Sequence, residues 1–345
     1  MLTPEKRITA LSALGEIMVK GAEGLSDGPS ALFADLIDTV RMSNPWFTPD
    51  NVRTAVANAG KMISGENLKK WVSAYPEIQN KHKPARIGVV MAGNIPLVGF
   101  HDFISVLITG NAINGKLSSK DELLMKAVSS TLLLIEPEFT GYIDLTTERI
   151  KGFEGVIATG SDNTSRYFEY YFRGYPSLIR HNRNSIAILD GRESAGELKL
   201  LGNDIFTYFG LGCRNVSKLY LPEGYPPETL AEHWKEYGKL RSHHKYAVNY
   251  DHNKAVMIVN RQSFTDTGFI LMCNDPSLTP PMAALNYEFY TSPEKLKEYL
   301  APLSDRIQCV AGHGHLAFGQ AQEPNLWDYA DEVDTINFLV KNFPH

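Results

Sequence analysis

The most informative feature of the chain is an alternation of short apolar runs and segments of helical spacing across residues 85–174. The apolar runs lie within 85–94, 111–119 and 153–161, and each ends in small or polar residues. Consecutive parallel strands need a long crossover, usually a helix, so this alternation is typical of a parallel sheet covered by helices. We therefore predict a doubly wound α/β sheet of the nucleotide-binding, Rossmann type.

Two further regions flank this alternation. Residues 1–83 have helical spacing, with Thr3 as a predicted N-cap and a later helix predicted to open at Asn51. We expect this region to pack on a dinucleotide-binding domain formed by residues 84–180. The tail, 311–345, is expected to join the same domain as a short closing helix and strand.

A second α/β domain is predicted over residues 181–310, and we expect it to be the catalytic domain. It opens with an apolar run at 185–190, and a helix over 196–209 buries one apolar face. Further predicted strands lie at 216–222, 254–260, 268–274, 285–291 and 306–312.

Length and composition narrow the function classes. A chain of 345 residues is long enough for two domains, and its net charge of −5 argues against nucleic acid as a partner. The three cysteines are widely spaced and match neither a disulfide framework nor a C-x-x-C site, so we expect a reducing, cytoplasmic setting. We expect neither a signal peptide nor a membrane span, because the apolar runs are too short.

Cys213 is the first candidate for chemistry. It follows Gly210 and Gly212 at the end of the predicted helix, and it precedes a predicted strand. At such an elbow the backbone N–H of the cysteine could stabilise an oxyanion while its sulfur attacks an acyl group. Free cysteines are also among the residues most often buried, and this pattern alone fits a structural thiol better.

Polar residues follow each predicted strand of the first domain. Ligands of open α/β sheets bind at the carboxyl edge, where these residues are expected. There Asn94 could donate to an oxyanion, and Lys116 could reach a ribose or a phosphate. Thr159, Gly160 and Ser161 could present backbone N–H groups to an anion. Each of them, taken alone, also fits a turn or a solvated loop.

Three histidine-containing stretches carry weaker signals. In "GHGH" (312–315) no nearby Cys, Asp or Glu completes a ligand set, so we predict no metal site. "RSHHK" (241–245) is expected to be an exposed basic loop. His181 could orient a catalytic group, although a structural histidine is the more common case.

The order of these signals resembles the aldehyde dehydrogenase superfamily. The matching segments are "TGNAINGKLSSKDELLM", "VIATGSDNTSRYF" and the cysteine segment "NDIFTYFGLGCRNVSKLYLP". Within the superfamily the chain resembles acyl-CoA reductases of the LuxC type, through "LIRHNRNSIAILDG" and "LWDYADEVDTINFL". The resemblance covers roughly residues 84–340 and implies an aldehyde-dehydrogenase-like fold.

The resemblance implies a mechanism with Cys213 as the nucleophile and Asn94 as an oxyanion donor. The Cys213 thiolate would attack an acyl-CoA thioester, coenzyme A would leave, and reduction would release an aldehyde. The resemblance implies that the acyl group is a fatty acyl group, so the product would be a fatty aldehyde. A thiol of ordinary pKa is mostly protonated at neutral pH, so a neighbour must activate it. Arg214 and His181 are the candidate auxiliary groups.

For the cofactor, the resemblance implies contacts from Lys116 and Ser118 to the adenosine ribose or its phosphate. It also implies that Thr159, Gly160 and Ser161 line the cofactor. A lysine beside serine hydroxyls suits a 2′-phosphate, so we expect NADPH, with NADH as the alternative.

Two departures from the superfamily pattern bear on the reaction. "IRHNRNS" stands where hydrolytic members carry a glutamate that activates water, which argues for exchange with a thiol such as coenzyme A. "DPSLTPPMAALNYEFY" stands where the ribose-binding glutamate is found, which leaves that side of the cofactor unassigned.

Other functions stay open at this point. One is an acylating dehydrogenase for a short acyl-CoA or an acyl phosphate, and another is a non-catalytic binding protein with the same fold. A thiol hydrolase would need a His and an Asn or Asp beside the cysteine. A homo-oligomer is compatible with every one of these alternatives.

Overall fold

The computed structural model describes residues 2–25, 27–79, 83–160 and 162–344 and divides the chain into two units. Unit 1 comprises Met1–Asn182 and Pro324–His345, and unit 2 comprises Arg183–Glu323. Thus the last residues of the chain return to the unit in which it begins. The assignment of cofactor binding and catalysis to separate domains stays a prediction.

The N-terminal region of unit 1 is helical, as predicted. Thr3 is the N-cap of the first helix, because its hydroxyl accepts a hydrogen bond from the Lys6 backbone N–H. The third helix begins two residues before the predicted start at Asn51, since Thr48 caps it. The elements are α1 (Pro4–Ala22), α2 (Ser30–Thr39), η1 (Val40–Met42), α3 (Pro49–Met62), α4 (Gly65–Ser73) and η2 (Pro76–Gln79).

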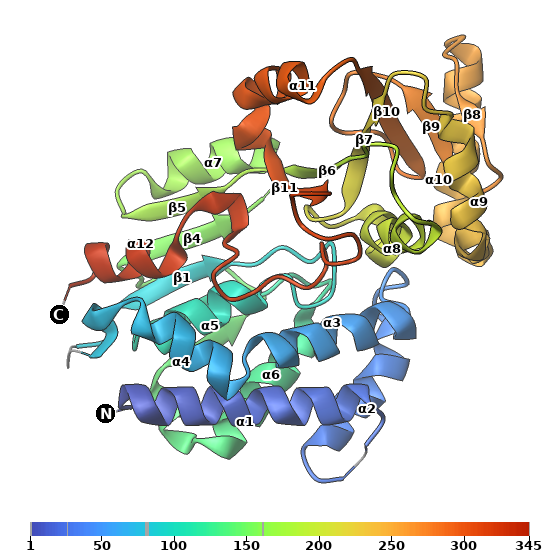
Figure 1. Ribbon diagram of the computed structural model, residues 1–345. Helices are drawn as coiled ribbons and strands as arrows, with labels where there is room; N and C mark the ends of the chain where they lie inside the picture. The colour runs from blue at the N-terminus through green and yellow to red at the C-terminus, as the bar shows by residue number, and fades with distance from the viewer. Residues whose placement is uncertain (1, 26, 80–82, 161, 345) are drawn as a thin grey trace. The chain divides into compact units, whose positions relative to one another are not determined.

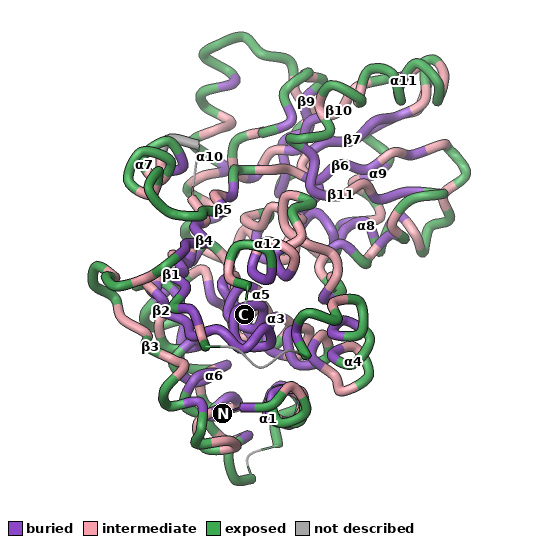
Figure 2. The backbone as a smooth tube through the Cα atoms, turned by 90° about the vertical axis from the view of Figure 1, so that its left-hand side faces the viewer, coloured by how far each residue is buried: buried purple, intermediate pink, exposed green. Residues whose placement is uncertain are grey.

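A five-stranded sheet, here called sheet A, forms the centre of unit 1. Its order is β3-β2-β1-β4-β5 and all pairs are parallel. The three central strands are buried along most of their length, which Figure 2 shows in purple. Its strands are β1 (Arg86–Val90), β2 (Ala112–Lys116), β3 (Ile143–Thr146), β4 (Gly155–Thr159) and β5 (Ser177–Arg180). The central strands are the three that the sequence predicts.

Helices connect the strands of sheet A (Figure 1). α5 packs against β1 and β2, α7 packs against β4 and β5, and α12 packs against α5. Gly110 follows α5 with a φ of +82°, as expected of a glycine that ends a helix. The remaining elements of unit 1 are α5 (Phe100–Ile108), α6 (Glu122–Ile135), η3 (Pro137–Gly141), α7 (Asp162–Phe172), η8 (Ala330–Glu332) and α12 (Thr335–Asn342).

A buried ion pair fastens the tail to sheet A. The Arg180 guanidinium at the end of β5 lies 2.6 Å from the Asp102 carboxylate, and it also donates to the Thr335 hydroxyl and the Ala330 carbonyl. Arg180 is only 3% exposed, so these partners neutralise a charge that water does not reach. The predicted closing strand is wrong, because the described residues of the tail form η8 and α12.

Unit 2 contains a six-stranded sheet, sheet B, with the order β11-β6-β7-β10-β9-β8. Its pairs are parallel except β8 with β9. The strands are β6 (Asn184–Ile188), β7 (Val216–Pro222), β8 (Thr265–Asp266), β9 (Leu271–Asn274), β10 (Ala284–Tyr290) and β11 (Ile307–Gly312). The helices are α8 (Ala195–Phe206), η4 (Thr207–Gly210), η5 (Pro227–Thr229), α9 (Leu230–His233), η6 (Lys235–Ser242), α10 (His244–Val259), α11 (Pro293–Leu300) and η7 (Ala301–Arg306).

Sheet B is covered on both faces, as the alternation along β7 shows. Leu219 and Leu221 join a core with α8 and Trp234, whereas Tyr220 joins a second cluster with Leu296 of α11. Because side chains alternate along a strand, these two clusters lie on opposite faces of the sheet.

The predicted strand over 254–260 is wrong, because this stretch is the end of helix α10. The helix buries Tyr246, Tyr250 and Met257, which share one helical face, while Val259 is 80% exposed. "RSHHK" is likewise not one exposed loop. It spans the end of η6 and the start of α10, and His243 is the helix cap.

Candidate active site

The loops that follow β1 and β2 meet at the carboxyl edge of sheet A. A Cβ added to Gly93 would lie 2.3 Å from the Ser118 Oγ, so only glycine lets these two loops pack this closely. Lys116 ends β2 opposite Val90 of β1, and its side chain is half-exposed. The structure therefore brings Ser118 against the residue that precedes Asn94.

Asn94 is exposed on this edge, and a buried acid supports its loop. Asp121, the N-cap of α6, accepts a hydrogen bond of 2.8 Å from the Leu97 backbone N–H, and Leu97 itself has a φ of +58°. Burial raises the pKa of Asp121 well above its ordinary value. This contact fixes a strained loop three residues after Asn94.

β4 ends at Thr159, beside β1 in the sheet, and Gly160 follows it. A Cβ at Gly160 would lie 3.0 Å from both Thr164 and Phe168 of α7. Ser161, predicted to line the cofactor, lies outside the described residues.

The strand order of sheet A reverses between β1 and β4, where an open α/β sheet binds its ligand. A Cβ at Gly93 would meet Ser118, and one at Gly160 would meet Thr164 and Phe168, so these glycines allow close packing of the backbone at this point.

In unit 2, Cys213 lies in a turn that precedes β7. Helix α8 ends at Phe206, earlier than the predicted 209, and Thr207 rather than a glycine is its C-cap. Tyr208, Phe209 and Gly210 then have φ values of +55°, +59° and +75°. Left-handed backbone in two aromatic residues is strained and persists only when surrounding contacts enforce it.

Aromatic packing holds this strained segment in place. Tyr208 and Phe209 are both buried. The Phe209 ring lies 4.5 Å from the His243 ring and 5.9 Å from the Tyr246 ring, measured between centroids. Both partners belong to the first turn of α10 and its cap, so the start of this helix supports the Cys213 segment.

Asn215 is the main hydrogen-bonding residue of the Cys213 turn, and sequence reasoning missed it. Its Nδ2 donates to the carbonyls of Asp204, Ile205 and Thr207 at the end of α8. Its Oδ1 accepts from the Gly212 backbone N–H at 2.8 Å. The signal that the sequence offers for this role is an asparagine directly before the predicted strand 216–222 and two positions after the candidate nucleophile.

Ser185 and Arg214 give the turn two more contacts. The Ser185 Oγ donates to the Cys213 carbonyl at 3.0 Å. The Arg214 Nε donates to the Ala321 carbonyl at 2.6 Å, and the Ala321 N–H in turn donates to the Asp204 carboxylate at 2.9 Å. Burial raises the pKa of Asp204 to about 6. The half-buried Arg214 is therefore fixed on the loop that follows β11.

The other candidates differ in their surroundings. His181 is exposed in unit 1, where its Nε2 lies 3.6 Å from the Glu169 carboxylate. Cys273 is fully buried in β9, with its sulfur 3.8 Å from the Met257 sulfur, and burial raises its thiol pKa to about 11. Cys213 and Cys309 are both half-buried, and none of the three cysteines forms a disulfide.

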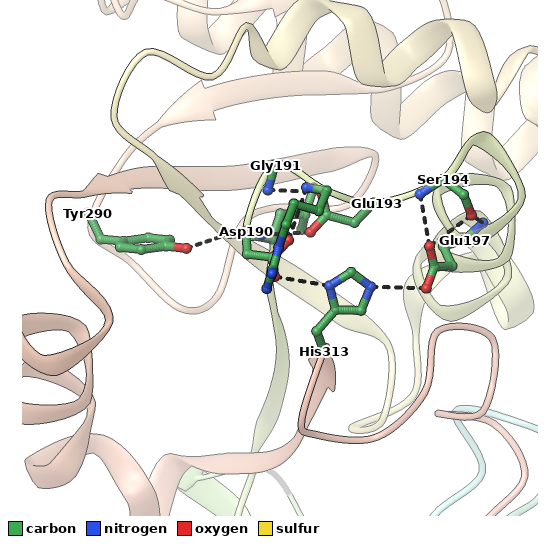
Figure 3. Close-up of polar contacts among 9 residues, drawn as sticks. Asp190, Gly191, Glu193, Ser194, Glu197, Tyr290 and His313 are labelled. Carbon is green, nitrogen blue, oxygen red and sulfur yellow. Dashed lines mark hydrogen bonds and ion pairs between the residues drawn. The ribbon is translucent and has the colours of Figure 1, made fainter.

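His313 corrects the reasoning about "GHGH", which assumed that no acid lies nearby. Figure 3 shows its ring between two carboxylates: Nδ1 lies 3.0 Å from Asp190 and Nε2 lies 3.0 Å from Glu197. Asp190, Glu193 and His313 offer ligand atoms within 4.8 Å of one another. The cluster lies where β6 and β11 end, whereas Cys213 precedes the start of the parallel strand β7.

We expect His313→Gln to lower thermal stability only where the histidine is charged. The two carboxylates raise the pKa of His313 above its ordinary value of 6.5, and bonds from Ser194 and His313 lower the pKa of Glu197 to about 2. A histidine whose pKa is higher in the folded than in the unfolded protein stabilises the fold at pH values below its unfolded pKa. This stabilisation is lost as the pH rises through the folded pKa. The variant should therefore melt slightly earlier than wild type at about pH 6 and equally at about pH 9.

Thermal unfolding at both pH values measures this effect. His315→Gln is the matched control, because His315 is an exposed histidine of the same loop. An equal loss of stability by His313→Gln at both pH values would show that the two hydrogen bonds do not depend on the histidine charge.

Among the described residues, no helix combines the length and the apolar character that crossing a membrane requires.

Solved structures of aldehyde dehydrogenases share this fold. Aldehyde dehydrogenase 21 from Physcomitrella patens, in complex with succinate, is 13% identical over 86% of this chain and 74% of its own, with a TM-score of 0.61. An NADP-dependent enzyme from E. coli is 11% identical over 86% and 70%, with a TM-score of 0.64. The Mycobacterium tuberculosis aldehyde dehydrogenase complexed with NAD+ is 12% identical over 86% and 76%, with a TM-score of 0.55. The predicted fold class is confirmed.

Sequence comparison identifies the family. No curated protein matches the chain. The model of the acyl-CoA reductase (LuxC) family matches residues 34–266, which include Asn94, Lys116 and Cys213. This match covers well over half of the chain, and the predicted resemblance is confirmed. The chain belongs to the LuxC family of acyl-CoA reductases.

Proposed function

We propose that this chain, an NAD(P)H-dependent acyl-CoA reductase by its family, converts a fatty acyl-CoA to a fatty aldehyde with NADPH through a thioester on Cys213. The observation that supports Cys213 as the nucleophile is the position of the three cysteines of the chain in the fold. Only Cys213 lies outside regular structure, on a half-exposed turn that strained backbone and Asn215 hold in place. Cys273 and Cys309 lie within strands of sheet B.

The first half of the proposed reaction forms the thioester. The Cys213 thiolate attacks the acyl carbonyl, and the Asn94 amide and the Cys213 N–H donate to the oxyanion. The oxyanion then collapses and coenzyme A leaves. Arg214, whose Nε is fixed on Ala321, favours the thiolate by its positive charge.

The second half releases the aldehyde. When bound, the reduced nicotinamide supplies the hydride that converts the thioester to a thiohemiacetal. Cys213 then leaves from this carbon and the aldehyde is released. "IRHNRNS" provides no glutamate to activate water, so the thioester persists until it is reduced.

In this proposal, Lys116, Ser118, Thr159 and Gly160 at the carboxyl edge of sheet A hold the cofactor. The lysine and the serine hydroxyl suit the 2′-phosphate of NADPH. The three cysteines, none of which forms a disulfide, support the further proposal of a reducing, cytoplasmic setting.

The substrate class is tested with a panel of acyl-CoAs from acetyl to palmitoyl, together with an acyl phosphate. NADPH consumption and aldehyde release are measured, with Cys213→Ala as the blank. We expect the highest kcat/KM for a long-chain acyl-CoA. A maximum at acetyl-CoA or at the acyl phosphate would assign the chain to another acylating reductase.

Lys116→Met tests the cofactor assignment. Because a hydrogen bond to a charged group contributes about 1.5–3 kcal/mol, we expect kcat/KM for NADPH to fall about 10- to 100-fold, with a smaller change for NADH. Lys120→Met is the control, since Lys120 is an exposed lysine of the same loop. Equal losses with NADPH and NADH, or an equal loss in the control, would contradict a 2′-phosphate contact.

A further inference from the structure

We propose that Cys309 is a resolving thiol for Cys213. When a hydroperoxide oxidises Cys213, Cys309 forms a disulfide with it and protects the nucleophile from irreversible oxidation. The inference rests on the proposed function, because it takes Cys213 to be the reactive thiol. It also gives a role to a cysteine that the reductase mechanism does not use.

A single buried hydroxyl connects the two cysteines. The Ser185 Oγ lies 3.0 Å from the Cys309 sulfur and donates to the Cys213 carbonyl, also at 3.0 Å. The Cys309 sulfur is therefore separated from the Cys213 backbone by only two hydrogen-bond lengths. Ser185 is fully buried, whereas both cysteines are half-exposed, so a small peroxide has access to the thiols.

The proton of Ser185 determines the state of Cys309. A serine hydroxyl has one proton, and Ser185 gives it to the Cys213 carbonyl, which can only accept. While Ser185 donates to this carbonyl, the Cys309 thiol is the group that can donate in the contact between the Cys309 sulfur and the Ser185 oxygen. When Cys309 loses its proton, the Ser185 hydroxyl can rotate to donate to the thiolate instead of the Cys213 carbonyl.

The strand pairing around Ser185 is irregular on both sides of β6. The register of β11 against β6 shifts between Ile307 and Val310, and the register of β6 against β7 shifts between Ser185 and Ile186. Such irregularities redirect side chains and occur often beside active sites. Strand β6 lies between β11, which carries Cys309, and β7, which follows Cys213. A disulfide needs a Cα separation of about 4.4–6.8 Å, so the proposal requires the Cys213 turn to move toward Cys309 when the disulfide forms.

The proposed chemistry has two steps. The Cys213 thiolate attacks the hydroxyl oxygen of the hydroperoxide, and an S–O bond forms as the O–O bond breaks. The sulfur becomes a sulfenic acid, and its two electrons go to the other peroxide oxygen, which leaves as alkoxide or hydroxide and takes up a proton from water. Cys309, after giving up its proton, attacks the Cys213 sulfur. The S–S bond forms, the S–O bond breaks, and hydroxide leaves and takes up the proton as water. A dithiol reductant restores both thiols by exchange.

The test uses the full-length chain, treated with hydrogen peroxide and analysed by intact mass and by peptide mapping without reductant. We expect wild type to lose two hydrogen atoms, to link the Cys213 and Cys309 peptides, and to regain activity with dithiothreitol. In Cys309→Ser, which retains a donor to Ser185, Cys213 should gain two or more oxygen atoms. Irreversible inactivation should be about tenfold faster than in wild type.

The buried Cys273 provides the matched control. Cys273→Ala should behave like wild type, and Cys309→Ala should repeat the result of Cys309→Ser if serine disturbs the strand. A wild type whose Cys213 is overoxidised as fast as in both Cys309 variants, with no linked peptides, would overturn the inference. The proposed function fails by a different result, namely acyl-CoA reduction that survives in Cys213→Ala.

Discussion

Cys213→Ala is expected to lower kcat/KM for acyl-CoA reduction by about 10⁴-fold or more, because removal of a covalent nucleophile eliminates the thioester path itself. Cys213 lies on a half-exposed turn whose backbone is held by Asn215 and Ser185, so the substitution should leave the fold intact. NADPH consumption with the best acyl-CoA measures the effect, and the melting temperature monitors folding.

Cys273→Ala is the control for this substitution, since it removes a buried thiol in the same unit. It should retain wild-type turnover per folded molecule. If Cys213→Ala also reduces acyl-CoA at the wild-type rate, the thioester path through this residue does not exist.

The second large effect is expected for Asn94→Ala. Loss of one oxyanion donor typically costs about 10²- to 10³-fold in kcat, because the donor is aligned before charge develops. Asn94→Asp should be at least as slow, since it places a negatively charged acceptor where a donor is needed. Because Asn94 is exposed, we expect its substitution to change stability by no more than about 0.5 kcal/mol.

Steady-state kinetics with saturating NADPH tests this expectation, and Asn260→Ala, at an exposed asparagine that ends α10, is the control. A kcat within about threefold of wild type for Asn94→Ala would remove this residue from the oxyanion site.

The central strands of sheet A could be predicted because they are buried along most of their length and therefore appear as continuous apolar runs. β3 and β5 gave no such signal. Each has only four residues, β3 has no fully buried residue, and both lie at the edges of the sheet. A strand that buries little side-chain surface leaves little trace in the sequence.

In helix α10 a short stretch of sequence gave a misleading strand pattern. Its last residues are β-branched and apolar, which favours a strand in a short window, yet Val256, Ile258 and Val259 are exposed. The helix forms because Tyr246, Tyr250 and Met257 share one buried face, a pattern visible only over the full length of the helix.

The contacts of the candidate site could be predicted only in part from the sequence. Cys213 could be proposed from the ordered resemblance, but its supports come from segments far apart in the chain. Ser185 and Cys309 contact each other across neighbouring strands, and His313 reaches Asp190 from 123 residues away. Such contacts depend on the pairing order of sheet B, which sequence spacing does not specify.

Whether Cys213 carries the acyl group can be measured by mass spectrometry of the wild-type chain incubated with a long-chain acyl-CoA in the absence of NADPH. We expect a mass increase of one acyl group, located on the Cys213 peptide, that disappears with aldehyde release when NADPH is added. An adduct on Cys273 or Cys309, or no adduct in a preparation that reduces the same acyl-CoA, would contradict it.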